Sequence, residues 1–150
     1  MKKMFFAICL FFAVLGVNAQ SYNHSVGLTV GFIDGVNYKC FIGSNVALSA
    51  DLGYNFRSSL SGGFHFNPNI MYQNRIARTP LEWFAGGGIS LGSAQRSFMM
   101  GLNAMGGIEY NFKAPLILGT DIRLGPGFEF RNKVNAAFLL SWNIFLRYRF

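Results

Sequence analysis

The feature that most constrains the fold of this chain is an alternation of apolar and polar residues, repeated in segment after segment from residue 25 to the last residue. In the last segment, one set of alternate positions is apolar, and the other set carries Asn143, Arg147 and Arg149. Successive side chains of a β-strand point to opposite faces, so a period of two predicts strands with one apolar and one polar face. A helix would bring residues three and four apart onto one face, and these segments do not follow that period.

Turn residues divide the alternating region into about eight expected strands. We expect them at residues 25–33, 36–42, 46–56, 60–72, 81–91, 98–112, 116–124 and 138–150. Asp34-Gly35 predicts a tight hairpin, because this pair tolerates the positive φ angles of such turns. Asn67-Pro68-Asn69 predicts a bulge, bend or strand end, because proline cannot donate to a sheet ladder. The seventh strand either ends at Leu124 or continues past Gly125-Pro126-Gly127 to Phe130.

The composition of the two faces predicts which one points inward. The polar faces are narrow, rich in Gly, Ser and Asn, and carry charges of both signs, which suits a closed interior held by ion pairs and hydrogen bonds. The charged residues expected to form this interior network are Asp51, Glu82, Glu109, Asp121, Arg123 and Arg147. An eight-stranded barrel has no room inside for the many large apolar side chains, so we expect them on the outside.

Aromatic residues gather at the strand ends on the apolar face. They are Tyr54, Phe56, Tyr110, Phe112, Tyr148 and Phe150. Girdles of aromatic side chains at both lipid–water interfaces, flanking an apolar band, are typical of transmembrane β-barrels. The sequence therefore predicts an all-β, up-and-down antiparallel barrel whose outer face lies in lipid.

The first nineteen residues have the composition of a secretory signal peptide. Lys2 and Lys3 form a basic start, and Phe5 to Val17 form an apolar core that is too short to span a bilayer. Val17-Asn18-Ala19 offers small residues at the cleavage positions, so we expect cleavage between Ala19 and Gln20. Residues 20–150 then form one barrel domain of an exported protein.

Charge and cysteine content argue against several other classes. Removing the leader takes two of the 13 basic residues and leaves 11 against 6 acidic ones, a net charge of about +5. The basic residues are scattered along the chain, so we expect no nucleic-acid surface. Cys40 is the one cysteine left after cleavage, which excludes an internal disulfide and makes a metal or redox role improbable. We expect no cofactor.

Three segments resemble the strands of small bacterial outer-membrane β-barrel proteins of the porin-like, eight-stranded kind. They are Leu81–Gly88, Gly107–Phe112 and the terminal Leu146-Arg147-Tyr148-Arg149-Phe150. The resemblance implies a place in the outer membrane of a Gram-negative bacterium, surrounded by its lipid. It also implies that Leu146, Tyr148 and Phe150 form the carboxy-terminal signal read by the barrel-assembly machinery, with periplasmic chaperones acting before insertion. Both termini would then lie in the periplasm.

The expected role is structural or surface-interacting, without catalysis and with no surface partner specified by the sequence. Members of this family often carry long outer loops, whereas the turns here are short, and only Gly125 to Ala137 offers a sizeable one. The first alternative is a narrow porin-like channel for ions or small solutes. A soluble periplasmic barrel of the lipocalin kind, with its apolar face inside, is a further alternative.

Two further hypotheses, an enzyme and a metal site, would place chemistry inside the barrel. A membrane-lipid-modifying enzyme could use His65 with Ser61 or Ser59, but a packed, hydrogen-bonded interior histidine is the more economical reading. The carboxylates of Asp51, Glu82, Glu109 and Asp121 could bind a metal, but basic residues are available to neutralise them, so we expect ion pairs. His24 is expected before the first strand, exposed to solvent.

Overall fold

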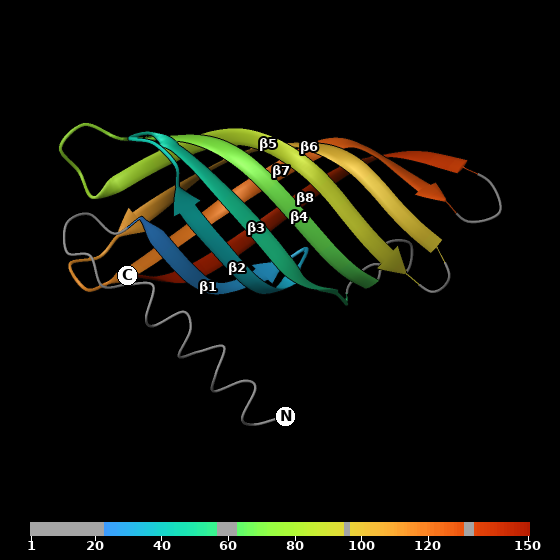
Figure 1. Cartoon of the computed structure of the whole chain (residues 1–150), viewed down its shortest axis with the longest axis horizontal. Helices are drawn as coiled ribbons and strands as arrows, with labels where there is room; N and C mark the ends of the chain where they lie inside the picture. The colour runs from blue at the N-terminus through green and yellow to red at the C-terminus, as the bar shows by residue number, and fades with distance from the viewer. Residues whose placement is uncertain (1–22, 57–62, 95–96, 131–133) are drawn as a thin grey trace, which may run out of the picture.

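The computed structural model describes residues 23–56, 63–94, 97–130 and 134–150, and these form one closed antiparallel barrel of eight strands (Figure 1). The strands are β1 (His24–Gly31), β2 (Asp34–Phe41), β3 (Val46–Asn55), β4 (Gly63–Arg75), β5 (Leu81–Ala94), β6 (Ser97–Asn111), β7 (Leu116–Phe130) and β8 (Val134–Arg149). Each strand pairs with its neighbour in sequence, and β1 closes the barrel on β8. The expected strand number and up-and-down topology are confirmed. The expected signal peptide lies outside the described residues.

The first hairpin turns earlier than expected. Asp34-Gly35 is not the turn: Phe32 and Ile33 form it, and Asp34 begins β2. The Asp34 carboxylate instead accepts a hydrogen bond from the Gly31 amide at 3.0 Å, which ties the two strand ends together. Gly35 pairs with Thr29 and with Gly53, where the backbone carbonyl of Leu52 leaves no space for a side chain.

The expected interruption at Pro68 is also wrong, because β4 runs through it. Pairing with β3 includes Ala50 opposite Pro68, and pairing with β5 has the same register on both sides of Pro68. Between Phe64 and Arg75, only the two positions of Asn67 and Pro68 lack a ladder partner on β5. The missing amide donor of Pro68 therefore interrupts the pairing at one place on the β5 side, and no bulge forms. Pro126 repeats this arrangement, since it pairs with Phe138 of β8 and lacks a partner on β6.

Strands β7 and β8 are longer than the turn residues suggested. β7 continues through Pro126 to Phe130, the longer of the two expected limits, and β8 begins at Val134. The sizeable loop expected at Gly125 to Ala137 is therefore wrong, because only residues 131–133 separate the two strands. Most of the segment that was expected to be a loop belongs instead to the paired strands β7 and β8.

The register fixes a large stagger around the barrel. A path across paired residues leaves β8 at Phe145, passes through Thr29, Gly35, Gly53, His65, Gly92, Met99 and Glu129, and returns to β8 at Asn135. The return point is ten residues from the start. Such a stagger goes with strands tilted by about 40° to the barrel axis.

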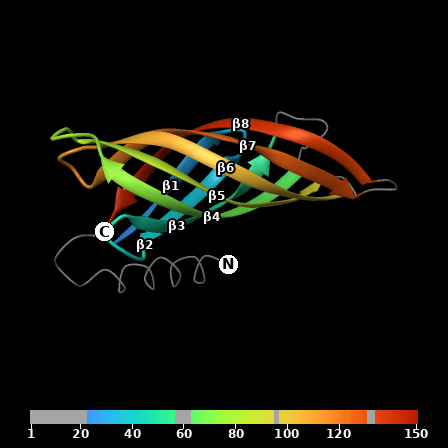
Figure 2. The same cartoon turned by 90° about the horizontal axis from the view of Figure 1, so that it is seen from above.

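The two ends of the barrel differ in shape because of this stagger. We call the end with His24 and Phe150 the terminal end, and the other the far end. At the far end every strand begins or ends within two residues of the staggered path, so the rim climbs like a ramp from β1 to β8. Figures 1 and 2 show β7 and β8 reaching well beyond the β1–β2 hairpin.

The ramp makes the wall uneven in height. At about 3.3 Å per residue and a tilt of about 40°, eight residues of β1 cover roughly 20 Å along the axis, and sixteen residues of β8 cover roughly 40 Å. A step therefore lies at the seam, where β1 pairs with β8 only from Ser25 to Gly31. Beyond Asn143, the β1-facing edge of β8 has no partner strand among the described residues.

A small apolar layer crosses the middle of an otherwise polar interior. Its buried members are Ala47, Met71, Phe84, Met105, Ile117 and Phe145. The rings of Phe84 and Phe145 lie 6.1 Å apart. Gly119 makes space for this layer, because a Cβ there would overlap the ring of Phe145 and lie 2.8 Å from the carbonyl oxygen of Ile108.

Gly119→Val should lower the free energy of unfolding by about 1–3 kcal/mol, since the layer is closely packed and cannot move aside cheaply. Gly43→Val is the matched control, because a Cβ at Gly43 meets nothing within 4 Å. Urea unfolding in detergent micelles, followed by tryptophan fluorescence, measures both. Equal stability losses in the two variants would contradict the packing argument.

Candidate functional site

The interior carries two groups of buried ion pairs. The first, the Glu109 cluster, consists of Lys39, Gln73, Glu82, Glu109 and Arg147. The Glu109 carboxylate accepts hydrogen bonds from Lys39 Nζ at 3.0 and 3.1 Å and from Arg147 Nη1 at 3.0 Å. Gln73 Nε2 donates to both Glu109 and Glu82, and its Oε1 accepts from Lys39. One carboxylate therefore holds two buried cations.

The second group, the Arg123 cluster, consists of Asp51, Asn69, Asp121, Arg123 and Asn143. Arg123 donates to Asp121 from Nε at 2.8 Å and from Nη2 at 3.0 Å, and to Asp51 from Nη1 at 2.7 Å. Asn143 Nδ2 donates to Asp121 at 3.0 Å. One guanidinium thus serves two carboxylates, so the cluster carries a formal charge of −1.

Asn37 joins the two clusters across the barrel. Its Nδ2 donates to Asp51, and its Oδ1 accepts from Arg147 Nε. Asn143 extends the network to the first hairpin, because its Oδ1 accepts from the amides of Phe32 at 3.0 Å and Ile33 at 3.2 Å. The result is a hydrogen-bonded network that ties the seven strands β2 to β8 together through the barrel interior.

The expectation of a charged and polar interior is confirmed. Of the six residues predicted to form it, Asp51, Glu109, Asp121, Arg123 and Arg147 are each at most 5% exposed. Glu82 lies at the edge of the Glu109 cluster and also meets the exposed Arg75 at 3.7 Å. The structure splits the predicted residues between the two clusters.

Sequence reasoning missed the amides of this network, and it counted Lys39 among the cations available to the carboxylates without placing it in the network. Lys39 is 2% exposed and pairs with Glu109, seventy residues away along the chain. Asn37, Gln73 and Asn143 are equally buried and link the charges. Their alternate positions placed them on inward faces, but nothing in the sequence indicated which strands would bring them together.

His65 is buried at 5% exposure on the inner face of β4, and its ring meets Phe32 edge-on at 5.8 Å. Ser59 and Ser61, its suggested catalytic partners, lie outside the described residues. Asn67, Ser90 and Asn103 surround the same region.

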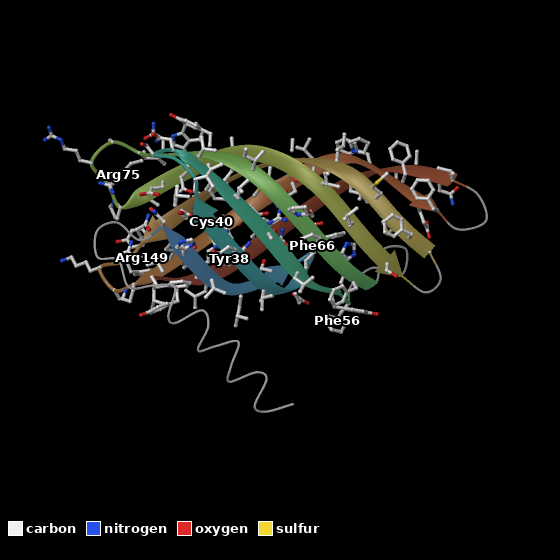
Figure 3. All side chains as sticks on the ribbon, in the orientation of Figure 1. Tyr38, Cys40, Phe56, Phe66, Arg75 and Arg149 are labelled. Carbon is white, nitrogen blue, oxygen red and sulfur yellow. The ribbon has the colours of Figure 1, made fainter. Side chains whose placement is uncertain are left out.

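The outer face of the barrel is apolar, whereas its interior is mostly polar. Large apolar side chains are exposed on all eight strands, among them Leu28, Val36, Leu52, Ile70, Ile89, Leu102, Ile122 and Leu140. Of the aromatic residues predicted at the strand ends, Tyr54, Phe56, Tyr110, Phe112 and Tyr148 are exposed there and Phe150 is half-buried. Tyr54 packs on Phe56 and Tyr110 on Phe112, with ring centroids 4.6 and 4.9 Å apart. Figure 3 shows Phe56 and Phe66 standing outward from the wall.

The carboxy-terminal residues complete the seam at the terminal end. Leu146 and Tyr148 point outward, and the Phe150 amide donates to the His24 carbonyl at 3.0 Å. His24 is not a free terminus residue as expected: it begins β1, its Nδ1 lies 2.8 Å from the Tyr38 hydroxyl, and its ring stacks on Phe150. Cys40, the one cysteine beyond the expected leader, is half-buried on β2.

Cavities lie toward both ends of the interior. At the terminal end a vestibule of about 270 Å³ is lined by Gln73, Arg75, Glu82, Glu109 and Asn111, among others. Toward the far end a small enclosed cavity of about 30 Å³ lies beside His65 and Arg123. The two charged clusters and the apolar layer occupy the interior between them.

No group of three or more His, Cys, Asp or Glu side chains in the described part of the chain could hold a metal ion. No helix in that part is both long and apolar enough to cross a membrane. Comparison with known proteins adds no identity: no protein-family model matches the sequence, and no curated protein matches it.

Proposed function

We propose that this protein is an integral outer-membrane β-barrel with a structural or surface-interaction role and no catalytic activity. The observation that carries the proposal is the inverted distribution of polarity: buried ion pairs inside, and exposed apolar side chains on every strand outside. Soluble proteins seldom expose contiguous apolar patches above a few hundred Å². A lipid surrounding accounts for the outer face, since a closed barrel satisfies its backbone internally.

Further support comes from the aromatic residues and from the two ends of the sequence. Exposed aromatics lie toward both ends of the outer face, as the girdles of membrane barrels do. The amino-terminal leader predicts export, with cleavage between Ala19 and Gln20, and the Leu146, Tyr148 and Phe150 pattern predicts delivery by periplasmic chaperones and the barrel-assembly machinery. We place both termini in the periplasm, so that the ramped far end faces outward.

The filled interior supports a sealed barrel over the channel alternative. Arg147, Lys39, Phe84 and Phe145 are all at most 2% exposed, so side chains fill the middle of the barrel. Eight strands enclose a space that side chains fill. A soluble, ligand-binding barrel would need an apolar interior, and here the buried apolar residues are few and lie among charged and polar side chains.

Fractionation and heat modifiability test the proposal. The full precursor, expressed in a Gram-negative host, should be recovered in outer membranes, resist extraction by alkaline carbonate, and change mobility on a detergent gel when boiled. Purified protein in planar bilayers should give no resolved conductance steps. A protein recovered from the soluble periplasm without a mobility shift would overturn the membrane proposal, and regular conductance steps would favour the channel.

A further inference from the structure

The step at the seam between β1 and β8 holds a groove of about 490 Å³. It begins where strand pairing stops, at Gly31 opposite Asn143. Its lining residues are Val30, Gly31, Phe32, Asn55, Leu140, Ser141, Trp142 and Ile144. The groove therefore follows directly from the ten-residue stagger, which leaves β8 standing above the end of β1.

The lining changes from apolar to polar across the wall. Val30, Leu140, Trp142 and Ile144 belong to the outer face and are 45–68% exposed. Asn55 and Ser141 belong to the inner face, and Asn55 is fully buried. A molecule in the groove would thus meet an apolar surface on the membrane side and polar groups on the barrel side.

The groove adjoins the small interior cavity, and the two share Phe32 and Ser141. That cavity, about 30 Å³, has room for about one or two water-sized groups. It is lined by Asn67 and Asn103, whose side-chain oxygens accept no hydrogen bond from any described residue. Asn67 is only 3% exposed, so its unpaired acceptor faces a buried space that water cannot freely reach. A buried acceptor of this kind needs a hydrogen-bond donor.

We propose that this groove binds a single-chain amphiphile from the membrane, with its acyl chain against Trp142 and an uncharged, hydrogen-bond-donating head directed at Asn67. This inference rests on the proposed membrane location. The idle groups are acceptors, so the head must donate, as a hydroxyl or amide does. Arg123 is the charged residue that lines the cavity, and its guanidinium is already shared by the carboxylates of Asp51 and Asp121, so it offers no unpaired charge to an anionic head.

The β1-facing edge of β8 supports a polar-headed occupant. Backbone groups at membrane depth need hydrogen-bond partners, and this edge lacks a strand partner from Val134 to Ser141 in the described part of the chain. A second copy does not fit: two copies related by rotation about the membrane normal would cross their tilted β8 strands at about 80°, which forbids a ladder.

Tryptophan quenching by a brominated 1-monoacylglycerol tests the proposal. Trp142 lines the groove, whereas Trp83 lies on β5 beside Tyr72. In phosphatidylcholine vesicles, the Trp83→Phe variant reports Trp142 and the Trp142→Phe variant reports Trp83. Trp142 should be quenched saturably at low mole fraction, and Trp83 only in proportion to the brominated lipid present. Unbrominated monoacylglycerol should compete, and the ionised fatty acid of equal length should compete poorly.

Two substitutions and a control separate the parts of the site, all in the Trp83→Phe background. Asn67→Leu should weaken monoacylglycerol binding about threefold to tenfold, as expected for one buried hydrogen bond, and should remove the preference over the fatty acid. Ser141→Met should reduce saturable quenching by filling the groove. Ser93→Met, exposed on β5 opposite the seam, should change nothing.

Proportional quenching of both tryptophans by a membrane-integrated, heat-modifiable protein would overturn this inference alone. Failure of the protein to enter membranes would instead overturn the proposed function. Equal competition by the fatty acid would refute the donor head. Loss of heat modifiability identifies any variant that has not folded, and binding is then judged on Trp142 of the Trp83→Phe parent protein.

Discussion

Arg123→Met is expected to lower the free energy of unfolding by about 3–5 kcal/mol, because it leaves two buried carboxylates without their shared cation. Asp51 and Asp121 are each 1% exposed, and Arg123 meets them at 2.7 and 2.8 Å. Asn143 and Asn69 can satisfy part of their hydrogen bonding but cannot neutralise them. Urea unfolding in lipid vesicles, monitored by tryptophan fluorescence, measures the loss.

Arg75→Met is the matched control for this variant. Arg75 also pairs with a carboxylate, but at 3.7 Å and with a side chain that is 67% exposed, so its removal should cost less than about 1 kcal/mol. Adding Asp51→Asn and Asp121→Asn to Arg123→Met should recover most of the lost stability, because the unpaired charges are then gone. Similar losses for Arg123→Met and Arg75→Met would contradict the buried-cluster account.

Glu109→Gln is expected to have an effect of similar size, about 3–5 kcal/mol, and of opposite electrostatic origin. The shape of the side chain is kept, but Lys39 and Arg147, each at most 2% exposed, lose the carboxylate that they share. Among the described contacts, Glu82 is linked to the other members of the Glu109 cluster only by its hydrogen bond with Gln73. The same unfolding measurement applies.

A double-mutant cycle identifies the origin of that loss. Lys39→Met combined with Glu109→Gln should be more stable than Glu109→Gln alone, because one of the two uncompensated cations is removed. The coupling between these residues should be large, whereas coupling between Glu109 and the distant Arg75 should be near zero. Additive effects of Lys39→Met and Glu109→Gln would show that the pair does not act as a unit.

The period-two pattern predicted the strand number, the topology and the face of each strand, because alternation reports directly on which side chains share a face. It did not predict the partners within the interior. Lys39 and Glu109 come from β2 and β6, and their meeting depends on register and stagger, which no local pattern contains. The same limit applies to Asn37, whose bridging role needs three strands in place.

Local rules failed where tertiary pairing outweighed them. Pro68 was expected to interrupt its strand and Pro126 left the end of its strand open, yet each keeps a paired residue on one neighbouring strand and loses only a local ladder contact on the other. Asp34-Gly35 is a favoured turn pair, but Asp34 caps the strand end by accepting from Gly31, and the chain turns at Phe32 and Ile33. The many other paired residues of the barrel keep the sheet intact despite these local exceptions.

The uneven wall also bears on how the chain reaches its closed form. Hairpins from β3 to β8 can pair one after another with neighbours in sequence, and the last ladder, β7–β8, is longer than the first, β3–β4. Closure alone joins distant parts of the chain, with Phe32 donating to Asn143 across 111 positions. The ladder that closes the barrel runs along β1, where the barrel wall is short. The seam is thus the one pairing among the eight strands that no hairpin supplies, and it rests on seven residue pairs.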